Sequence, residues 1–182
     1  MKIFFRNIFQ LILHPAHGWE DIAKENTPAR IPALGGLLPL IIIAALSVFL
    51  APIYHSIVDW TRLVFNAVAT FTMFFPAYFL GAFMLINFAG PMLKVPLDEN
   101  KCNTFALYTI GLLAIITILT NCFPFLDSFI YFLPIYVAII QWKGIDYMSV
   151  KPEAVGHFMM LAVLGVLAPP YIIYFLFSLI IR

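Results

Sequence analysis

Charged residues are scarce in this chain of 182 residues: Asp, Glu, Lys and Arg make up only 10% of it, against about 25% in a typical soluble domain. Apolar residues make up 63%. So few charges exclude a soluble globular domain and a disordered chain. The formal net charge of +1 gives no basic surface, so nucleic acid is not an expected partner. The composition therefore predicts an integral membrane protein whose main partner is the lipid bilayer.

Cysteine is nearly absent, which excludes a disulfide-stapled scaffold. The two cysteines, Cys102 and Cys122, fall at opposite ends of one apolar segment. If that segment is a helix, their Cα atoms lie about 30 Å apart, far beyond the reach of a disulfide. We expect two free thiols.

The charges that are present cluster, and the clusters leave five charge-free apolar segments. Each segment is read as a helix that crosses the bilayer, which needs about 20 apolar residues. The fourth is short, so we place the turn before it at residues 121–124. The predicted spans are residues 31–54, 63–93, 102–122, 125–142 and 154–181. The alternative for residues 102–142 is a re-entrant hairpin that does not cross, which would need protein around its backbone.

The first 30 residues form the other predicted unit, a cytoplasmic amphipathic segment that precedes the membrane domain of residues 31–182. Residues 1–13 resemble a signal peptide, but Arg6 and Asn7 interrupt the apolar stretch and no small-residue cleavage site follows. We expect a helix lying in the membrane interface, with Lys2 and Arg6 toward the headgroups. A second helix begins at Pro15 and turns Trp19, Ile22 and Ala23 toward the membrane. The predicted fold is all-α: a polytopic bundle of five transmembrane helices with N-terminal interfacial helices.

Helix-start residues support these boundaries. Thr27, Asp59, Asp98 and Asp127 each stand just before an apolar run, as N-cap residues do. Lys151-Pro152-Glu153 opens the last span, with proline suited to the first helical position and glutamate to the positive helix end.

The distribution of basic residues predicts the orientation. With five spans, one side of the membrane receives eight Lys and Arg residues: Lys2, Arg6, Lys24, Arg30, Lys94, Lys101, Lys143 and Lys151. The other side receives Arg62 and Arg182. The positive-inside rule then places the N-terminus in the cytoplasm and the C-terminus outside. We expect a location in the bacterial inner membrane.

Catalytic signatures are missing from the sequence. It has no Gly-x-Ser-x-Gly, no His-Glu-x-x-His, no phosphate-binding glycine loop and no ionisable residue in the middle of a predicted span. His14, His17 and Glu20 are spaced to share a helix face, but no fourth ligand accompanies them, so we predict no metal site. His157 follows Glu153 by one turn and is explained as an ion pair at the membrane boundary. We therefore expect no enzyme and no cofactor.

Prolines within the spans are the most unusual feature. Pro76 falls near the middle of span two, and Pro169 and Pro170 near the middle of span five. Helices broken at the midplane can form transporter sites, because their freed carbonyls are available to a substrate. The simpler interpretation is that neighbouring helices re-satisfy the backbone, since no charged group accompanies the breaks. Ala77-x-x-x-Gly81 offers a small-residue contact between helices.

Two stretches carry a family resemblance. The first, LILHPAHGWEDIAKE, contains Pro15-x-x-x-Trp19-x-x-Ile22 ahead of a long apolar span. The second, YVAIIQWKGIDYMSVKPEAV, contains Gly144 and a short polar loop before the last span. With five spans, the chain resembles the Yip-domain family (Ypt-interacting protein, YIPF type) in its short bacterial form. The resemblance implies a five-helix membrane domain in which Pro15, Trp19 and Ile22 anchor the N-terminal helices and Gly144 forms the turn between spans four and five.

The resemblance also limits the expected function. Eukaryotic members are linked to vesicle traffic and to prenylated Rab-type GTPases, but this sequence has neither their long cytosolic N-terminal region nor an Asp-Leu-Tyr-Gly-Pro motif, so Rab binding is not carried over. The leading hypothesis is a non-enzymatic membrane-organising scaffold that contacts lipids, other membrane proteins or a second copy of itself. The alternative is a small-solute, ion or lipid transporter or scramblase that uses the proline breaks.

Overall fold

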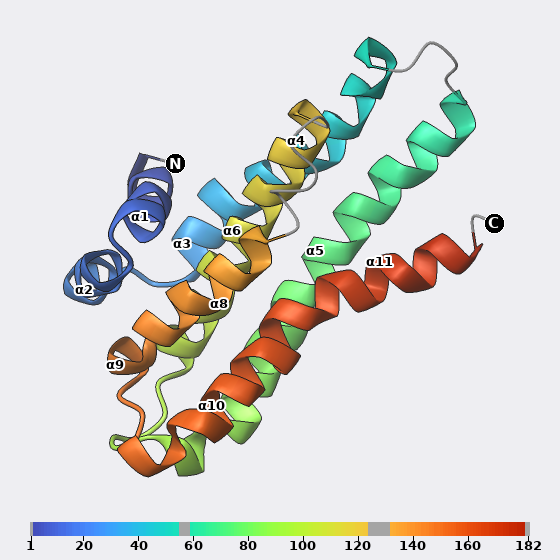
Figure 1. The fold of residues 1–182 in the computed structure, drawn as a ribbon. Helices are drawn as coiled ribbons and strands as arrows, with labels where there is room; N and C mark the ends of the chain where they lie inside the picture. The colour runs from blue at the N-terminus through green and yellow to red at the C-terminus, as the bar shows by residue number, and fades with distance from the viewer. Residues whose placement is uncertain (1, 55–58, 124–131, 181–182) are drawn as a thin grey trace.

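The computed structural model describes residues 2–54, 59–123 and 132–180. Within them the chain is helical, apart from turns and one isolated antiparallel bridge between Leu93 and Val150. The helices form an elongated bundle (Figure 1). Four segments of the described chain are long and apolar enough to cross a membrane: Arg30–Ile53, Trp60–Phe88, Glu99–Cys122 and Pro152–Leu179. These helices support the predicted all-α membrane protein.

The first and the last of these segments are composite helices, each interrupted by one π-helical turn. The first consists of α3 (Arg30–Pro32), the π-helical turn η1 (Ala33–Leu37), α4 (Leu38–Ser47) and the 3-10 helix η2 (Val48–Ile53). The last consists of the 3-10 helix η5 (Pro152–Ala154), α10 (Val155–Ala162), the π-helical turn η6 (Val163–Leu167) and α11 (Ala168–Ile180). The chain changes direction between α10 and α11 (Figure 1).

The second segment, α5 (Trp60–Phe88), is an uninterrupted helix, and it passes through Pro76 without a break. Of the two interpretations of Pro76, the structure therefore has the simpler one, a proline tolerated within a continuous helix. Proline removes only one backbone hydrogen bond, and Pro76 is exposed on the surface of the helix. The small-residue contact lies in α5 as expected: Ala77 is buried, and a Cβ on Gly81 would lie 3.2 Å from a methyl carbon of Val166.

The third segment, α6 (Glu99–Cys122), is the centre of the bundle. Its residues 104–114 are all buried, and it contacts α1, α4, α5 and α8. A helix that is apolar and buried all round belongs in a core, and α6 fits that description. Cys102 and Cys122 are both free thiols at its two ends, as predicted.

The predicted fourth span, residues 125–142, is only partly described. Its first part lies outside the described residues, and α8 (Leu133–Lys143) covers the rest. The short helix α9 (Ile145–Met148) follows. Gly144, at the end of α8, lies against Phe105 near the start of α6. α8 therefore ends at the end of the bundle where α6 begins.

Two loops meet at that same end. The Lys94 N–H donates to the Ser149 carbonyl at 2.8 Å, and the Lys151 N–H donates to the Met92 carbonyl at 2.9 Å. Met92 ends the 3-10 helix η3 (Gly90–Met92). The loop after α5 and the loop after α9 thus lie together, as the predicted topology requires.

The N-caps are confirmed at two of the four predicted positions. A carboxylate oxygen of Asp59 accepts the N–H groups of Thr61 and Arg62, and one of Asp98 accepts those of Asn100 and Lys101. Thr27 was wrongly predicted, because α3 begins at Arg30 with Ala29 at the N-cap position. Asp127 lies outside the described residues.

Candidate functional site

The N-terminal residues form two amphipathic helices, α1 (Lys2–Leu13) and α2 (Pro15–Glu25), that contact each other and the bundle. Phe4, Ile8 and Leu11 recur every three to four residues, so they share one face of α1. That face is 0–1% exposed in the structure. The apolar face of α1 is therefore covered by protein, where we had expected it to meet lipid.

Phe4 shows how closely α1 approaches the spans. Its ring lies over two glycines: a Cβ on Gly36 would come within 2.2 Å of the Phe4 ring, and one on Gly111 within 3.2 Å. The ring also stacks on Tyr108 at a centroid distance of 5.5 Å. Gly111 lies twelve residues after the first residue of α6, about 18 Å along the helix. α1 therefore lies against the side of the bundle.

Trp19 occupies the centre of this junction. It is 2% exposed, and its indole Nε1–H donates to the Ile140 carbonyl of α8 at 2.9 Å. Its ring stacks on Phe105 and on Tyr147, each at 5.1 Å between centroids. This corrects the prediction that Trp19 faces the membrane: an indole buried with its N–H paired is a packing anchor between α2, α6, α8 and α9.

Gly144 makes room for that indole. A Cβ at this position would lie 2.7 Å from the Phe105 ring and 2.9 Å from the Trp19 ring. The structure thus brings together two residues from the two stretches that carry the family resemblance. Gly144 also caps the C-terminus of α8, as its predicted role in the turn requires.

Pro15 and Ile22 are the other two residues of α2 that were predicted to anchor the N-terminal helices. Pro15 stands in the first turn of α2, where its missing N–H costs nothing, as predicted. Ile22 is 5% exposed and faces the protein core, which corrects its expected contact with the membrane. The Ile22 carbonyl accepts the N–H of Asn26, a residue with a left-handed φ of 41° that ends the helix. Ala23 is exposed.

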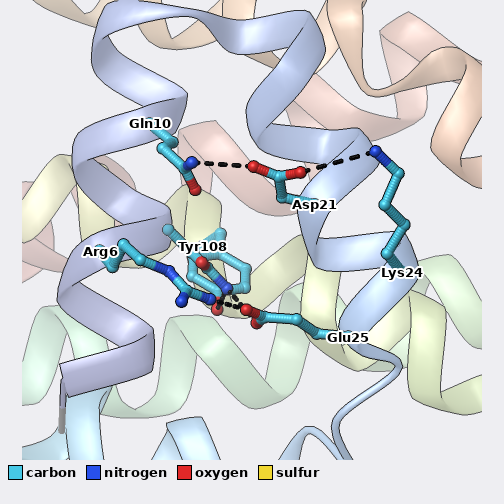
Figure 2. Close-up of polar contacts among 7 residues, drawn as sticks. Arg6, Gln10, Asp21, Lys24, Glu25 and Tyr108 are labelled. Atoms are coloured by element: carbon cyan, nitrogen blue, oxygen red, sulfur yellow. Dashed lines mark hydrogen bonds and ion pairs between the residues drawn. The ribbon is translucent and has the colours of Figure 1, made fainter.

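Polar side chains connect α1 to α2 and to α6 (Figure 2). The Asn7 amide donates to Glu25 Oε2 at 2.8 Å and to the Tyr108 hydroxyl at 3.1 Å. Arg6 forms an ion pair with Glu25. Gln10 donates to Asp21 at 2.8 Å, and Lys24 lies 3.8 Å from Asp21. We call the residues Arg6, Asn7, Glu25 and Tyr108 the junction cluster.

Burial makes the junction cluster energetically sensitive. Asn7 is 1% exposed, and its Oδ1 atom, like Oε1 of Gln10, has no hydrogen-bond partner among the described residues. An unsatisfied buried polar atom costs about 1–3 kcal/mol. The hydrogen bonds of the Asn7 amide to Glu25 and Tyr108 offset part of that cost.

The junction has few groups suited to catalysis. The junction cluster contains one ion pair, one amide and one phenol, with no nucleophile beside a general base. Among the described residues no three His, Cys, Asp or Glu side chains gather as metal ligands would. His17 Nδ1 lies 3.3 Å from Glu20, and both side chains are exposed; His14 stands at the N-cap of α2. The arrangement is suited to binding and positioning.

The Pro169-Pro170 pair, a possible helix break in the sequence, coincides with an irregular helix. Both prolines are buried at the start of α11, directly after η6. The Ala168 N–H donates to the Val163 carbonyl. Since neither proline has an N–H, the Gly165 carbonyl has no donor four or five residues ahead of it in the chain. Gly165 lines a cavity of about 340 Å³ between α5 and the last segment.

The two π-helical turns share a sequence pattern that we had not recognised. Residues 34–39 read LGGLLP and residues 164–169 read LGVLAP, so Leu-Gly-x-Leu-x-Pro occurs twice. Each copy overlaps a π-helical turn, η1 or η6, and each turn borders a cavity along α5. A proline after the turn removes the donor that would otherwise continue the regular α-helical pattern.

The junction cluster was also missed by sequence reasoning. We had placed Arg6 toward the headgroups and assigned no role to Glu25 or Tyr108. The available signal was Asn7, a polar residue that stands on the apolar face between Phe4 and Ile8 and therefore needs a buried partner. The partner itself, 101 positions later in the sequence, could not be identified from that pattern.

No protein-family model, curated protein or solved structure matches this chain.

Proposed function

We propose that the protein is a five-span protein of the bacterial inner membrane with a cytoplasmic N-terminus and an external C-terminus. Two structural features support five spans. α8 ends beside Phe105 near the start of α6, so Gly144 and Cys122 lie toward opposite ends of α6. The loops around Lys94 and Ser149 are also hydrogen-bonded to each other, which puts both at one end. The excess of Lys and Arg at that end supports a cytoplasmic assignment.

We further propose that the protein acts without catalysis, as a membrane-organising scaffold that contacts lipids or other membrane proteins. The observation that carries this proposal is the outer face of α1. Ile3, Phe9 and Leu13 are 47%, 65% and 67% exposed, although the inner face of the same helix is buried. Lys2 and Arg6 lie on the same side. An apolar face with cations beside it suits the boundary between headgroups and acyl chains, or a helix of a partner protein.

The resemblance to the Yip-domain family fits this role. Trp19 and Gly144 belong to the two resembling stretches, and they pack against each other in the junction. The residues that carry the resemblance therefore hold the α1–α2 hairpin on the bundle. Membership of that family stays a proposal, and Rab binding is not part of it.

Photo-crosslinking in native membranes tests the scaffold. A photoreactive residue replaces Phe9, with a matched control at Phe83, which is 57% exposed on α5. A scaffold whose α1 face contacts other membrane proteins predicts discrete protein adducts from position 9 and lipid adducts only from position 83. Equal adduct patterns at the two positions would count against a dedicated contact surface on α1.

The second candidate function is transport or lipid scrambling, and one observation favours it: the interrupted helix at η6 beside a cavity in the middle of the last segment. Purified protein in liposomes separates the two functions. A scaffold moves fluorescent lipid between leaflets no faster than empty vesicles do. A rate above that background that is abolished in Pro169→Ala would replace the scaffold with the transporter.

A further inference from the structure

The cavity between α5 and α10 is lined by an unusual set of side chains. Three of the seven methionines of the chain, Met84, Met92 and Met160, line this one cavity together with His157. They come from three elements: Met84 from α5, Met92 from η3, and His157 and Met160 from α10. His157 and Met160 are three residues apart, so they share one face of α10.

Gly165 leaves the space that Met84 uses. A Cβ at position 165 would lie 3.1 Å from the Met84 Cβ and 3.5 Å from its Cγ. The side chain of Met84 therefore passes directly over Gly165, which also lines the cavity. This contact places the first carbons of the Met84 side chain at the wall of a space of about 340 Å³.

These methionines are not filling gaps in a closed core. Met73 and Met148, which are 8% and 2% exposed, have that role elsewhere in the structure. Met160 is 60% exposed, and Met84 and Met92 are half-buried. Their flexible side chains thus border an accessible space and can adjust to an occupant.

The donor atoms determine which occupant suits the cavity. Thioether sulfur is a soft ligand that selects Cu(I), and imidazole also binds copper. No carboxylate or thiolate lines the cavity, so hard divalent cations lack the anionic oxygen ligands that they prefer. A monovalent cation also costs less to desolvate among apolar side chains than a divalent one.

We propose that this cavity binds one Cu(I) ion through the thioethers of Met84 and Met160 and the imidazole of His157, with Met92 as a further sulfur donor. This binding does not depend on the scaffold function, because it uses residues far from α1 in the sequence and needs no partner protein.

The test is an anaerobic titration of the purified full-length protein in lipid nanodiscs with the Cu(I)–bathocuproine disulfonate complex. We expect one Cu(I) per chain. Met160→Leu should weaken binding at least tenfold, and Met84→Leu should do the same. The matched control is Met159→Leu, since Met159 is the neighbouring methionine and does not line the cavity.

Met160→Cys provides a second check, because it keeps a soft sulfur donor and should retain Cu(I) binding within a few-fold. X-ray absorption of the loaded wild type should show sulfur neighbours and one nitrogen around copper. Absence of Cu(I) binding, equal weakening by Met159→Leu, or unchanged binding when Met84, Met92 and Met160 are all leucine would each overturn the proposal. Leucine replaces methionine with little change in volume, so these variants are expected to fold.

Discussion

Gly144 is a residue where one added methyl group would disturb the packing of the junction. Its φ of −81° is open to any residue, so the glycine is required for space and not for backbone freedom. We expect Gly144→Ala to push against Trp19 and Phe105 and to destabilise the protein by about 1–3 kcal/mol. Thermal unfolding in detergent measures the change.

Gly156→Ala is the matched control for that substitution. Nothing lies within 4 Å of a Cβ at Gly156, and the residue lies inside α10. Alanine is a better helix former than glycine, so the control should be neutral or more stable by up to about 1 kcal/mol. If the two variants unfold at the same temperature, Gly144 does not have the packing role assigned here.

Trp19 gives a second prediction at the residue scale. Trp19→Phe keeps an aromatic ring between Phe105 and Tyr147 but removes the indole N–H that pairs with the Ile140 carbonyl. We expect a loss of about 1–3 kcal/mol, because the buried indole hydrogen bond and part of the ring packing are lost, while the Ile140 carbonyl still accepts the Gly144 N–H. Trp60→Phe, at a tryptophan that is 64% exposed, should change the unfolding temperature little in the same assay.

The buried phenol of Tyr147 makes the stability of the protein depend on pH. Burial raises the pKa of Tyr147 above its ordinary value of 10.0. The folded state therefore keeps the phenol neutral where the unfolded chain ionises it. The stability that this residue contributes is complete below pH 10 and falls as the pH rises through and beyond 10, by at most about 1.4 kcal/mol per pH unit.

Unfolding of the wild type and Tyr147→Phe between pH 8 and pH 11 measures this contribution. The difference in stability between the two proteins should shrink as the pH rises above 10, since only the wild type has this phenol. Parallel pH profiles would show that Tyr147 does not titrate with unfolding.

At the scale of elements, the docking of α1 makes a testable claim. Asn7→Ala leaves Tyr108 and Glu25 without the amide that joins them, so α1 should separate from α6 more readily. We expect amide hydrogen exchange in residues 2–13 to become faster by a factor that corresponds to about 1–3 kcal/mol. Asn103→Ala removes only an exposed hydrogen bond within α6 and should leave that exchange unchanged.

Helix ends were predictable where their chemistry is local. Asp59 and Asp98 cap the helices that directly follow them, because the bonded N–H groups lie two and three residues away. Thr27 failed for a tertiary reason. The side chain of Asn100, on another helix, accepts the Ala29 N–H at 2.7 Å, and a single sequence gives no sign of that contact.

The docking of α1 and α2 could not be predicted from their amphipathic pattern. A stripe formed by Phe4, Ile8 and Leu11 is equally suited to lipid and to a protein surface, since both are apolar. What decides between them is the complementary surface of Gly36 and Gly111, which lies on two other helices. The hydrophobic period thus predicted which face is buried but not what covers it.

Proline position alone was also an incomplete guide. Pro76 sits in a regular helix, whereas Pro39 and Pro169 each follow a π-helical turn. Pro39 and Pro169 each follow a Leu-Gly-x-Leu-x pattern, which is missing before Pro76. The glycine in this pattern lowers helix propensity one turn before the position where proline removes a backbone N–H. Two residues that weaken an α-helix therefore lie close together.

At the scale of the whole molecule, the prediction concerns the number of membrane spans and the compartment in which each terminus lies. Five spans put the N-terminus in the cytoplasm and the C-terminus outside, whereas four spans would put both ends on one side. A reporter active only in the cytoplasm should give signal when fused before Lys2, and a reporter active only outside should give signal when fused after the last residue. Finding both ends in one compartment would contradict five spans and the orientation built on them.

The contacts of α1 also impose an order on biosynthesis. Phe4 and Trp19 are synthesised before the surfaces that receive them, because Gly111, Ile140 and Gly144 are translated more than a hundred residues after Phe4. Until those surfaces exist, the apolar face of the nascent α1–α2 hairpin is only partly covered, because Gly36 is synthesised well before Gly111 and Gly144. We therefore expect α1 and α2 to remain at the translocation machinery or on the membrane during synthesis. They pack fully onto the bundle only after the residues around Gly144 have been made.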